Sequence, residues 1–469
     1  MIGKNWKIDN IGPTVRISIL VSCFGLSFGF GTASIAGLLD VIRDQFGLSI
    51  HDEQALVASL VVACFVGAAV AGPVSAVYGR RRAIFLAIVL GVTGYAIMLG
   101  GPGLVELFVA RVLVGLSIGL SSMVVPMYAA ETTIARHRGA VVALFQLAVT
   151  SGILGAYGVS LAFVATVPWH ILLGIGIIPV GCGLLGLLLL PESPRWLAVK
   201  GDRVTLDRAA HALGLHAELP VSQPAPVSSQ STFSLLRRGS TMAVLVLCSL
   251  LFVLQNLSGI DGILYYAPRI FRGLGFSAGT AAMAATFGLG LINFLATLVA
   301  LVLVDRTGRR PLLIWGSAAM VLGLAAVVVA AIFDWSWLGL VGLALYIAAF
   351  AVSLGPLPYV LMSELFPAAI REQGVATASA TSWLFNALVA FTFLSMVDTV
   401  GLPASIGAFL AICLLSLIIC ALFVPETRAV RLEVIEANVL SGQRVRRLGL
   451  PLPVAAQQNA ISVAPQAMA

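Results

Sequence analysis

Charged residues are scarce in this chain of 469 residues: only 10% are Asp, Glu, Lys or Arg, whereas 59% are hydrophobic. A soluble globular domain is typically roughly a quarter charged. A chain this apolar would aggregate in water, so the composition excludes a soluble protein and predicts an integral membrane protein. The net charge of +7 does not indicate nucleic-acid binding, because the basic residues are concentrated in polar segments between apolar runs.

Catalytic and metal-binding patterns are also missing. The six cysteines all fall inside apolar runs, without metal-ligand spacing or the loop positions of a disulfide framework. No HExxH, GxSxG or CxxC pattern occurs, and the five histidines lie in loops or at span ends. We therefore expect no enzyme activity, no cofactor and no metal. Residues 1–16 are polar and lack a small-residue cleavage site, so we expect no removable signal peptide.

What the chain has instead is a series of apolar runs of about 20 residues, the length of helix that crosses a bilayer. About twelve such spans are expected, at residues 15–38, 55–77, 83–101, 104–129, 139–164, 169–190, 241–267, 279–304, 311–333, 337–361, 373–396 and 403–424. The predicted fold class is an all-α membrane protein of two six-helix halves. Its expected domains are an N-terminal half (1–190), a linker with short helices near 201–214 and 232–238 (191–240), a C-terminal half (241–424) and a polar tail (425–469).

Basic residues indicate the orientation of these spans. Nearly all of the 27 lysines and arginines fall in segments that share one side of the membrane if both termini lie there. Only Arg43, Arg269 and Arg272 fall on the other side, and Arg111 lies within a span. Because basic loops stay on the cytoplasmic side, both termini are expected in the cytoplasm.

An internal repeat relates the two halves. GRRRAIF at 79 is echoed by GRRPLLI at 308, and PES at 191 by PET at 425. Glu131 and Arg138, seven residues apart, are echoed by Glu364 and Arg371 at a nearly constant offset. Two parallel repeats related by an axis along the membrane normal form one known transporter plan, with its substrate site near the midplane between the repeats.

One polar stretch interrupts the apolar run from 242 to 271. The segment 255–266, QNLSGIDGILYY, holds an amide pair, two glycines and Asp261. A carboxylate near the centre of a membrane span costs several kcal/mol unless it faces a partner or water. Gly259 and Gly262 flank the carboxylate and loosen the helix where its backbone could line a cavity. The stretch therefore predicts a binding site for a small polar molecule.

Six motifs carry a resemblance to a known family: GRR at 79–81, PESPRWL at 191–197, QNLSGID with YYAP at 255–268, DRTGRRP at 305–311, SELFPAAIR at 363–371 and PETR at 425–428. In this order they resemble the sugar porter family of the major facilitator superfamily. The resemblance implies transport of a monosaccharide (a hexose, pentose or related polyol) by alternating access, as a proton symporter or a facilitator. It also implies a functional monomer in the lipid bilayer of the plasma or inner membrane.

The resemblance also implies a sugar site. Its polar residues would be Gln146, Gln255, Asn256, Asp261, Asn293, Tyr359, Trp383 and Asn386, with Phe28 and Phe350 as apolar walls. Sugar hydroxyls both donate and accept hydrogen bonds, so amides suit them, and aromatic rings cover the apolar faces of a sugar ring. The alternative is that these amides form hydrogen bonds between packed spans.

Two gates follow from the same resemblance. Tyr265 and Tyr266 resemble the extracellular gate aromatics, with an interfacial aromatic belt as the alternative. A cytoplasmic latch between the halves is expected from Glu131, Arg138, Glu192, Arg195, Asp305, Arg309, Arg310, Glu364, Arg371 and Glu426. The alternative for these charges is topology and helix capping. Ala76 replaces the acid that corresponds to Asp305.

The residues for proton coupling depart from the family pattern. Arg111 is present, but Gly31 stands where proton-coupled relatives have an aspartate. Asn256, Tyr359 and Asp261 replace a glutamine, a tryptophan and an asparagine, respectively. Three hypotheses stay open for Asp261: it is a protonatable coupling group, an ionised sugar ligand, or a cap on the second half of a broken span.

Two other classes of protein compete with this interpretation. A major facilitator exporter of drugs or organic ions would favour a greasier cavity and lack PESPRWL and the amide cluster. A non-transporting sugar receptor of this fold usually adds a long cytoplasmic tail, whereas residues 425–469 are short.

Overall fold

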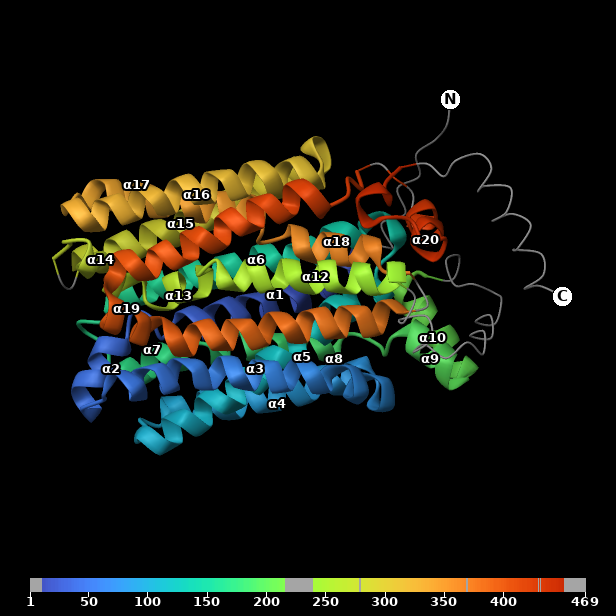
Figure 1. Cartoon of the computed structure of the whole chain (residues 1–469). Helices are drawn as coiled ribbons and strands as arrows, with labels where there is room; N and C mark the ends of the chain where they lie inside the picture. Colours follow the sequence, from blue (N-terminus) through green and yellow to red (C-terminus); the bar gives the residue numbers. More distant parts are fainter. Residues whose placement is uncertain are drawn as a thin grey trace, which may run out of the picture.

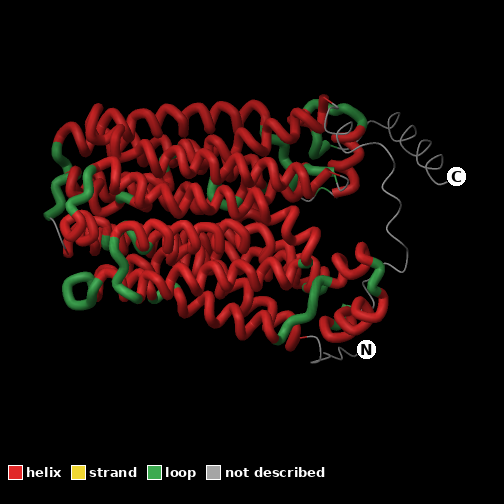
Figure 2. The backbone as a smooth tube through the Cα atoms, turned by 90° about the horizontal axis from the view of Figure 1, so that it is seen from below, coloured by secondary structure: helices red, strands yellow, loops and turns green. Residues whose placement is uncertain are grey.

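The protein is a bundle of long helices that lie side by side (Figure 2). The computed structural model describes residues 11–215, 239–277, 280–367, 370–428, 430 and 432–450. Among these residues the regular structure is helical throughout, and 11 helices are long and apolar enough to cross a membrane. The predicted fold class, an all-α membrane protein, is confirmed.

The first half holds six spans in the order that the sequence predicts. Its helices are α1 (Ile11–Ala33), α2 (Leu39–Phe46), α3 (Ile50–Tyr78), α4 (Arg80–Leu99), α5 (Leu104–Thr132), α6 (Ala135–Phe163), α7 (Trp169–Gly174) and α8 (Ile177–Leu188). Two linker helices follow, α9 (Pro194–Lys200) and α10 (Arg203–Leu213). The short helix expected near 201–214 is thus present, while the one expected at 232–238 lies outside the described residues.

The second half repeats this plan with more interruptions. Its helices are α12 (Gly239–Leu257), α13 (Ile260–Tyr265), α14 (Ala267–Gly273), α15 (Thr280–Thr307), α16 (Arg309–Phe333), α17 (Ser336–Val352), α18 (Leu357–Leu365), α19 (Arg371–Phe423), α20 (Leu432–Leu440) and the 3₁₀ turn η3 (Val445–Arg447). The last two expected spans are both inside α19, joined at Gly401, whose φ of 82° is not helical. This junction explains why 11 long helices correspond to about twelve predicted spans.

The two halves meet along two pairs of helices. Within the first half α1 packs against α6, and α3 against α5; between the halves α3 packs against α19, and α6 against α15. Figure 1 shows α9, α10 and α20 at one end of the bundle, here called the linker end. The helices α2, α7 and α14 lie at the opposite end, here called the far end (Figure 1).

The predicted break in the polar stretch is present at Gly259. This residue caps α13 with φ 90° and ψ 7°, a left-handed conformation that glycine adopts at little cost. A Cβ atom here would collide with the ring of Phe409 on α19. Because the next helix begins directly after the break, Asp261 lies in the first turn of α13, where the helix dipole favours a negative charge.

We expect Gly259→Ala to destabilise the protein by about 2–4 kcal/mol, since an L-residue is strained in this conformation and its methyl group meets Phe409. Thermal unfolding of the purified protein in detergent measures the loss. Gly407→Ala is the matched control: this α19 glycine has open space around it, so the change should be neutral or slightly stabilising. Equal melting temperatures for both variants would contradict a structural role for the break.

Candidate functional site

Hydroxyl groups from both halves hold the broken span in place. The Tyr346 hydroxyl on α17 donates to the carbonyl of Ser258 (2.9 Å), directly before the break. The Tyr157 hydroxyl on α6 donates across the halves to the carbonyl of Leu264 (2.7 Å). Backbone carbonyls freed by a break in a membrane helix must be satisfied inside the protein. These two tyrosines satisfy them on either side of Asp261.

Gln255 is the most informative predicted sugar ligand. Its side chain is 8% exposed, and its Nε2 donates to the carbonyl of Gly355, between α17 and α18 (2.9 Å). This bond fixes the amide, but its Oε1 is buried and accepts no hydrogen bond from the described residues. A buried acceptor without a partner is costly, so this oxygen is positioned to accept a hydrogen bond from a ligand.

Asn256 is engaged within the protein. Its Nδ2 donates to the carbonyl of Phe252 (2.7 Å) and to the hydroxyl of Ser382 on α19 (3.0 Å). These two bonds are of the kind expected if the amide joins packed spans instead of binding a sugar. The neighbouring amides Gln255 and Asn256 therefore have different surroundings in this state.

Asp261 belongs to a short polar chain that leads toward the far end. The side chain of Asn386 on α19 is a polar neighbour of the Asp261 carboxyl. The Tyr265 hydroxyl donates to the Oδ1 atom of the same Asn386 (3.3 Å). Asn386 thus connects the predicted gate aromatic Tyr265 to the carboxyl group, and an amide can pass a change at one partner on to the other.

Aromatic rings gather around the same stretch. Phe28 on α1 contacts Trp383 on α19, with ring centroids 5.5 Å apart, so the two halves meet through these rings. Tyr359 on α18 packs edge-on against Phe252 (4.7 Å) and remains 46% exposed. Rings of this kind can cover the apolar face of a sugar.

The remaining predicted sugar ligands come from three elements. Gln146 lies on α6 and Asn293 on α15, the helices that pack against each other across the halves. Gln146 is partly exposed, whereas Asn293 is 6% exposed. Phe350 is partly buried at the end of α17, and its ring lies beside Gly355, the partner of Gln255.

Tyr266 is turned away from Asn386. Its side chain is 1% exposed, its hydroxyl donates to the carbonyl of Ala390 (3.1 Å), and its ring stacks on Phe393 (5.6 Å). Tyr265 and Tyr266 are thus both buried among packed helices rather than displayed on the surface, as an aromatic belt would be.

Arg111 is fully buried in α5 without a carboxylate at ion-pair distance among the described residues. Its Nε donates to the carbonyl of Leu56 (2.7 Å) and its Nη2 to that of Val57 (3.2 Å), both on α3. A Cβ atom at Gly31 would lie 2.9 Å from the Tyr95 hydroxyl. The space that a span 1 aspartate would need is therefore filled by Tyr95, and main-chain carbonyls take the place of a carboxylate.

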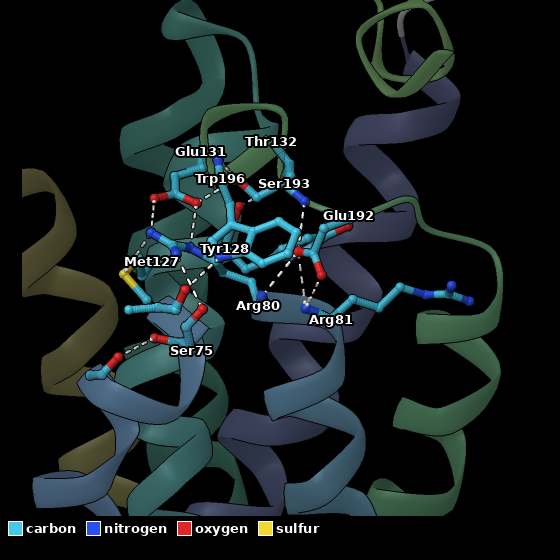
Figure 3. A network of polar contacts seen from close by, with 12 residues as sticks. Ser75, Arg80, Arg81, Met127, Tyr128, Glu131, Thr132, Glu192, Ser193 and Trp196 are labelled. Carbon is cyan, nitrogen blue, oxygen red and sulfur yellow. Dashed lines mark hydrogen bonds and ion pairs between the residues drawn. The ribbon is translucent and has the colours of Figure 1, made fainter. Parts of the chain in front are cut away.

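A charge cluster orders the linker end of the first half (Figure 3). Arg80 donates through Nε and Nη2 to both oxygens of Glu131 (3.0 and 2.9 Å). Glu192 accepts the backbone N–H groups of Arg80 and Arg81, the first residues of α4 (3.0 and 3.1 Å). A carboxylate on a helix N-terminus satisfies free N–H groups and complements the helix dipole.

The second half repeats this cluster. Arg309 donates to Glu364 (2.9 Å), and Glu426 accepts the backbone N–H groups of Arg309 and Arg310 at the start of α16 (3.1 and 3.2 Å). Ahead of each helix, Gly79 and Gly308 have φ of 97° and 104° with ψ of 160°. A Cβ atom at either glycine would meet the carboxylate, so only glycine allows this approach.

Most of the chain matches known transporters. A family model described as "Sugar (and other) transporter" matches residues 17–439. The galactose-proton symporter of Escherichia coli K12 is 35% identical over 452 residues, covering 94% of this chain and 97% of that protein. The arabinose-proton symporter of the same strain is 30% identical over 448 residues, covering 92% and 95%. The chain belongs to the sugar transporter family.

Solved structures agree with this assignment. The xylose transporter XylE from E. coli, in a partially occluded inward-open conformation, matches with a TM-score of 0.74 and 29% identity over 89% of this chain and 99% of that one. The proton:xylose symporter XylE bound to 6-bromo-6-deoxy-D-glucose matches with a TM-score of 0.73 and 28% identity over 94% and 99%. The predictions of a major facilitator fold and of an integral inner-membrane sugar transporter are confirmed, and the exporter alternative gains no support.

The linker-end charges of the transporter differ from the expected latch in one respect. Among the described residues, the ion pairs here lie within each half, Arg80 with Glu131 and Arg309 with Glu364, rather than between the halves. Arg195 is exposed, and the side chains of Arg138, Asp305 and Arg371 lie outside the described part of the chain. The expected latch between halves remains a prediction for another state.

Sequence reasoning missed two groups of residues in the transporter. Arg80 is not among the predicted latch residues, although the repeat that relates GRR at 79 to GRR at 308 pairs it with Arg309. The hydroxyls of Ser193 and Thr427, which donate to Glu131 and Glu364 (both 2.5 Å), follow the two repeated Pro-Glu pairs. The repeat itself was the signal that could have identified both.

We expect Glu192→Gln and Glu426→Gln to destabilise the transporter by similar amounts, about 0.5–2 kcal/mol each. An amide keeps one acceptor oxygen but loses the charge that complements the helix N-terminus. Thermal unfolding in detergent would measure both single variants and the double variant, whose effect should be nearly additive because the clusters are in separate halves. A large effect in one half and none in the other would show that the clusters are not equivalent.

Proposed function

We propose that this transporter takes up a monosaccharide by alternating access, together with a proton, and that it acts as a monomer with both termini in the cytoplasm. The relatives named above carry galactose, arabinose and xylose with a proton. The observation that supports a sugar most directly is the unpaired, buried Oε1 of Gln255. The two-fold plan and the basic linker end support the proposed halves and orientation.

The surroundings of Gln255 suit a sugar hydroxyl. Its Nε2 is fixed on the Gly355 carbonyl, so the acceptor oxygen does not have to be ordered when a ligand arrives. Phe28 and Trp383 lie on opposite halves with their rings in contact. A sugar between the halves would therefore meet a fixed acceptor from one half and an aromatic face from the other.

We expect Gln255→Leu to raise KM for the transported sugar by roughly 10- to 100-fold, because it removes the fixed acceptor and leaves a carbonyl unpaired. Uptake of labelled hexoses, pentoses and polyols, each competed against the others, measures the change and identifies the sugar. Gln373→Leu is the control, since that glutamine is exposed on α19. Unchanged affinity for every transported sugar in Gln255→Leu would contradict the proposed site.

Asp261 is the proposed proton carrier. It lies in the broken span between Ser258 and Leu264, whose carbonyls Tyr346 and Tyr157 hold, and Asn386 is a polar neighbour. The position that carries the aspartate in proton-coupled relatives is Gly31, crowded by Tyr95, and Arg111 is satisfied by carbonyls. A carboxyl at Asp261 could gain and lose a proton beside the sugar, so that protonation and sugar binding affect each other.

In sealed vesicles with an imposed proton gradient, we expect Asp261→Asn to abolish sugar accumulation while sugar counterflow continues, because the amide cannot exchange a proton. Loss of both activities would instead indicate that the ionised Asp261 binds the sugar directly. If the unmodified transporter never accumulates sugar against its gradient, the protein is a facilitator and Asp261 has no coupling role.

A further inference from the structure

A second charge network, separate from the linker-end clusters, joins the two halves at the far end. It consists of Asp40, Arg43 and Glu53 from the first half and Arg269 and Arg272 from the second, here called the outer latch. Arg269 donates from Nη1 to Glu53 Oε2 (3.0 Å), and Arg272 from Nη2 to Asp40 Oδ1 (3.0 Å). Both of these pairs cross from one half to the other.

Glu53 is the centre of the outer latch because it is the buried member. Its side chain is 3% exposed, whereas those of Asp40, Arg269 and Arg272 are 41%, 32% and 29% exposed. Its second oxygen, Oε1, lies 3.9 Å from Nε of Arg43 on α2. A buried carboxylate is costly when it loses its partner, whereas an exposed pair contributes little. The Glu53–Arg269 pair therefore contributes more to closing the far end than the exposed Asp40–Arg272 pair does.

On the first-half side of the latch, Arg43 is the cation that the acids share. Partial burial acts to lower the pKa of Arg43, but its hydrogen bond to Asp44 and the charges of Asp40, Asp44 and Glu53 outweigh burial and raise it. Arg43 thus stays cationic beside Glu53. It also pairs with Asp40 (3.2 Å), so the two acids that cross the seam share one cation of their own half.

Neutral contacts close the same seam. The Ser395 hydroxyl on α19 donates to Oε1 of Gln54, the residue after Glu53 (2.8 Å). The pocket lined by Ala36, Tyr265, Tyr266 and residues of the latch has a volume of about 10 Å³. This is close to the smallest volume that holds one water molecule, so the pocket has no room for a sugar.

The latch is placed where opening would break it. Arg269 is on α14, four residues after the gate aromatic Tyr265, and α14 continues the broken span that carries the sugar site. Arg111, through the carbonyls of Leu56 and Val57, fixes the turn of α3 that follows Glu53. Movement of α13 and α14 away from α3 would pull Arg269 from Glu53 while water entered to hydrate both.

We propose that Glu53 is a gating residue whose charge, held by Arg269 and Arg43, keeps the far end closed. Neutralising either Glu53 or Arg269 then shifts the transporter toward the state that is open at the far end. The proposal rests on the proposed function in taking the two halves to alternate, and its test also takes the far end to face the outside of the cell. It concerns the closing of the path, not the binding of the sugar.

A reporter cysteine tests this directly. Ala36→Cys, in a chain whose six native cysteines are replaced, places a thiol in the closed seam at a residue that is 6% exposed. A charged, membrane-impermeant thiol reagent is added outside intact cells, and the initial labelling rate is measured. We expect slow labelling in this parent and a rate about tenfold higher with Glu53→Gln or Arg269→Gln. The double variant should exceed neither single variant by much, since both break one pair.

Glu106→Gln is the matched control. This acid is exposed in the first turn of α5 and takes part in none of the ion pairs of the outer latch, so the labelling rate should not change. If Glu53→Gln fails to fold, Arg269→Gln tests the same pair from its more exposed side. Labelling rates equal to the parent in the folded variants would overturn the proposal.

Sugar uptake measured in the same cells separates the two proposals. Faster labelling in the two variants, with no sugar transported by the parent, would support the outer latch and contradict the proposed function. Normal sugar uptake with unchanged labelling would overturn the latch and leave the proposed function intact. A Tyr95→Phe variant, buried in the first half away from the latch, should label like the parent.

Discussion

Every polar group that this protein places in the apolar layer must find its partner inside the protein, because hydrocarbon offers none. The break at Gly259 is tolerated because tyrosine hydroxyls from α6 and α17 donate hydrogen bonds to backbone carbonyls on either side of Asp261. Arg111 is tolerated because carbonyls of α3 receive its guanidinium. At Gln255 Oε1, next to the broken span, a buried acceptor has no partner among the described residues, and the same constraint points to a ligand there.

The internal repeat accounts for the ends of the halves but not for their centre. Glu192 and Glu426 occupy equivalent positions on the N-termini of α4 and α16, each behind a glycine that makes room for the carboxylate. The broken span with Asp261 has no such copy in the first half, where α1 runs unbroken from Ile11 to Ala33. The repeated charge clusters thus follow the symmetry of the two halves, whereas the broken polar stretch occurs in the second half and departs from that symmetry.

The sequence predicted the frame well for physical reasons. Apolar runs report the spans directly, and Gly259 beside Asp261 reported a break, because both are local properties. Glu53 was missed because the expected span began at residue 55, while α3 begins at Ile50 and carries the carboxylate into the seam. The arginine that pairs with Glu53 is determined by how the two halves pack together, and a local sequence pattern does not carry this information. The linker-end acids illustrate the same limit: their type was evident, but their partners within each half were not.

The Tyr95 side chain packs between α1 and the α7–α8 connection, and this packing restricts which residues positions 31 and 176 can accept. A Cβ atom at Gly31 would approach the Tyr95 hydroxyl to 2.9 Å and Ile118 to 2.8 Å, and a Cβ atom at Gly176 would meet the same tyrosine ring. An aspartate at position 31 would therefore have to displace the hydroxyl end of Tyr95 and the end of the Ile118 side chain. A smaller residue at 95 would make this room, but beside Gly31 and Gly176 it would leave a cavity. The residues at 31, 95 and 176 are thus coupled through packing, so a change at one of them alters what the other two can accept.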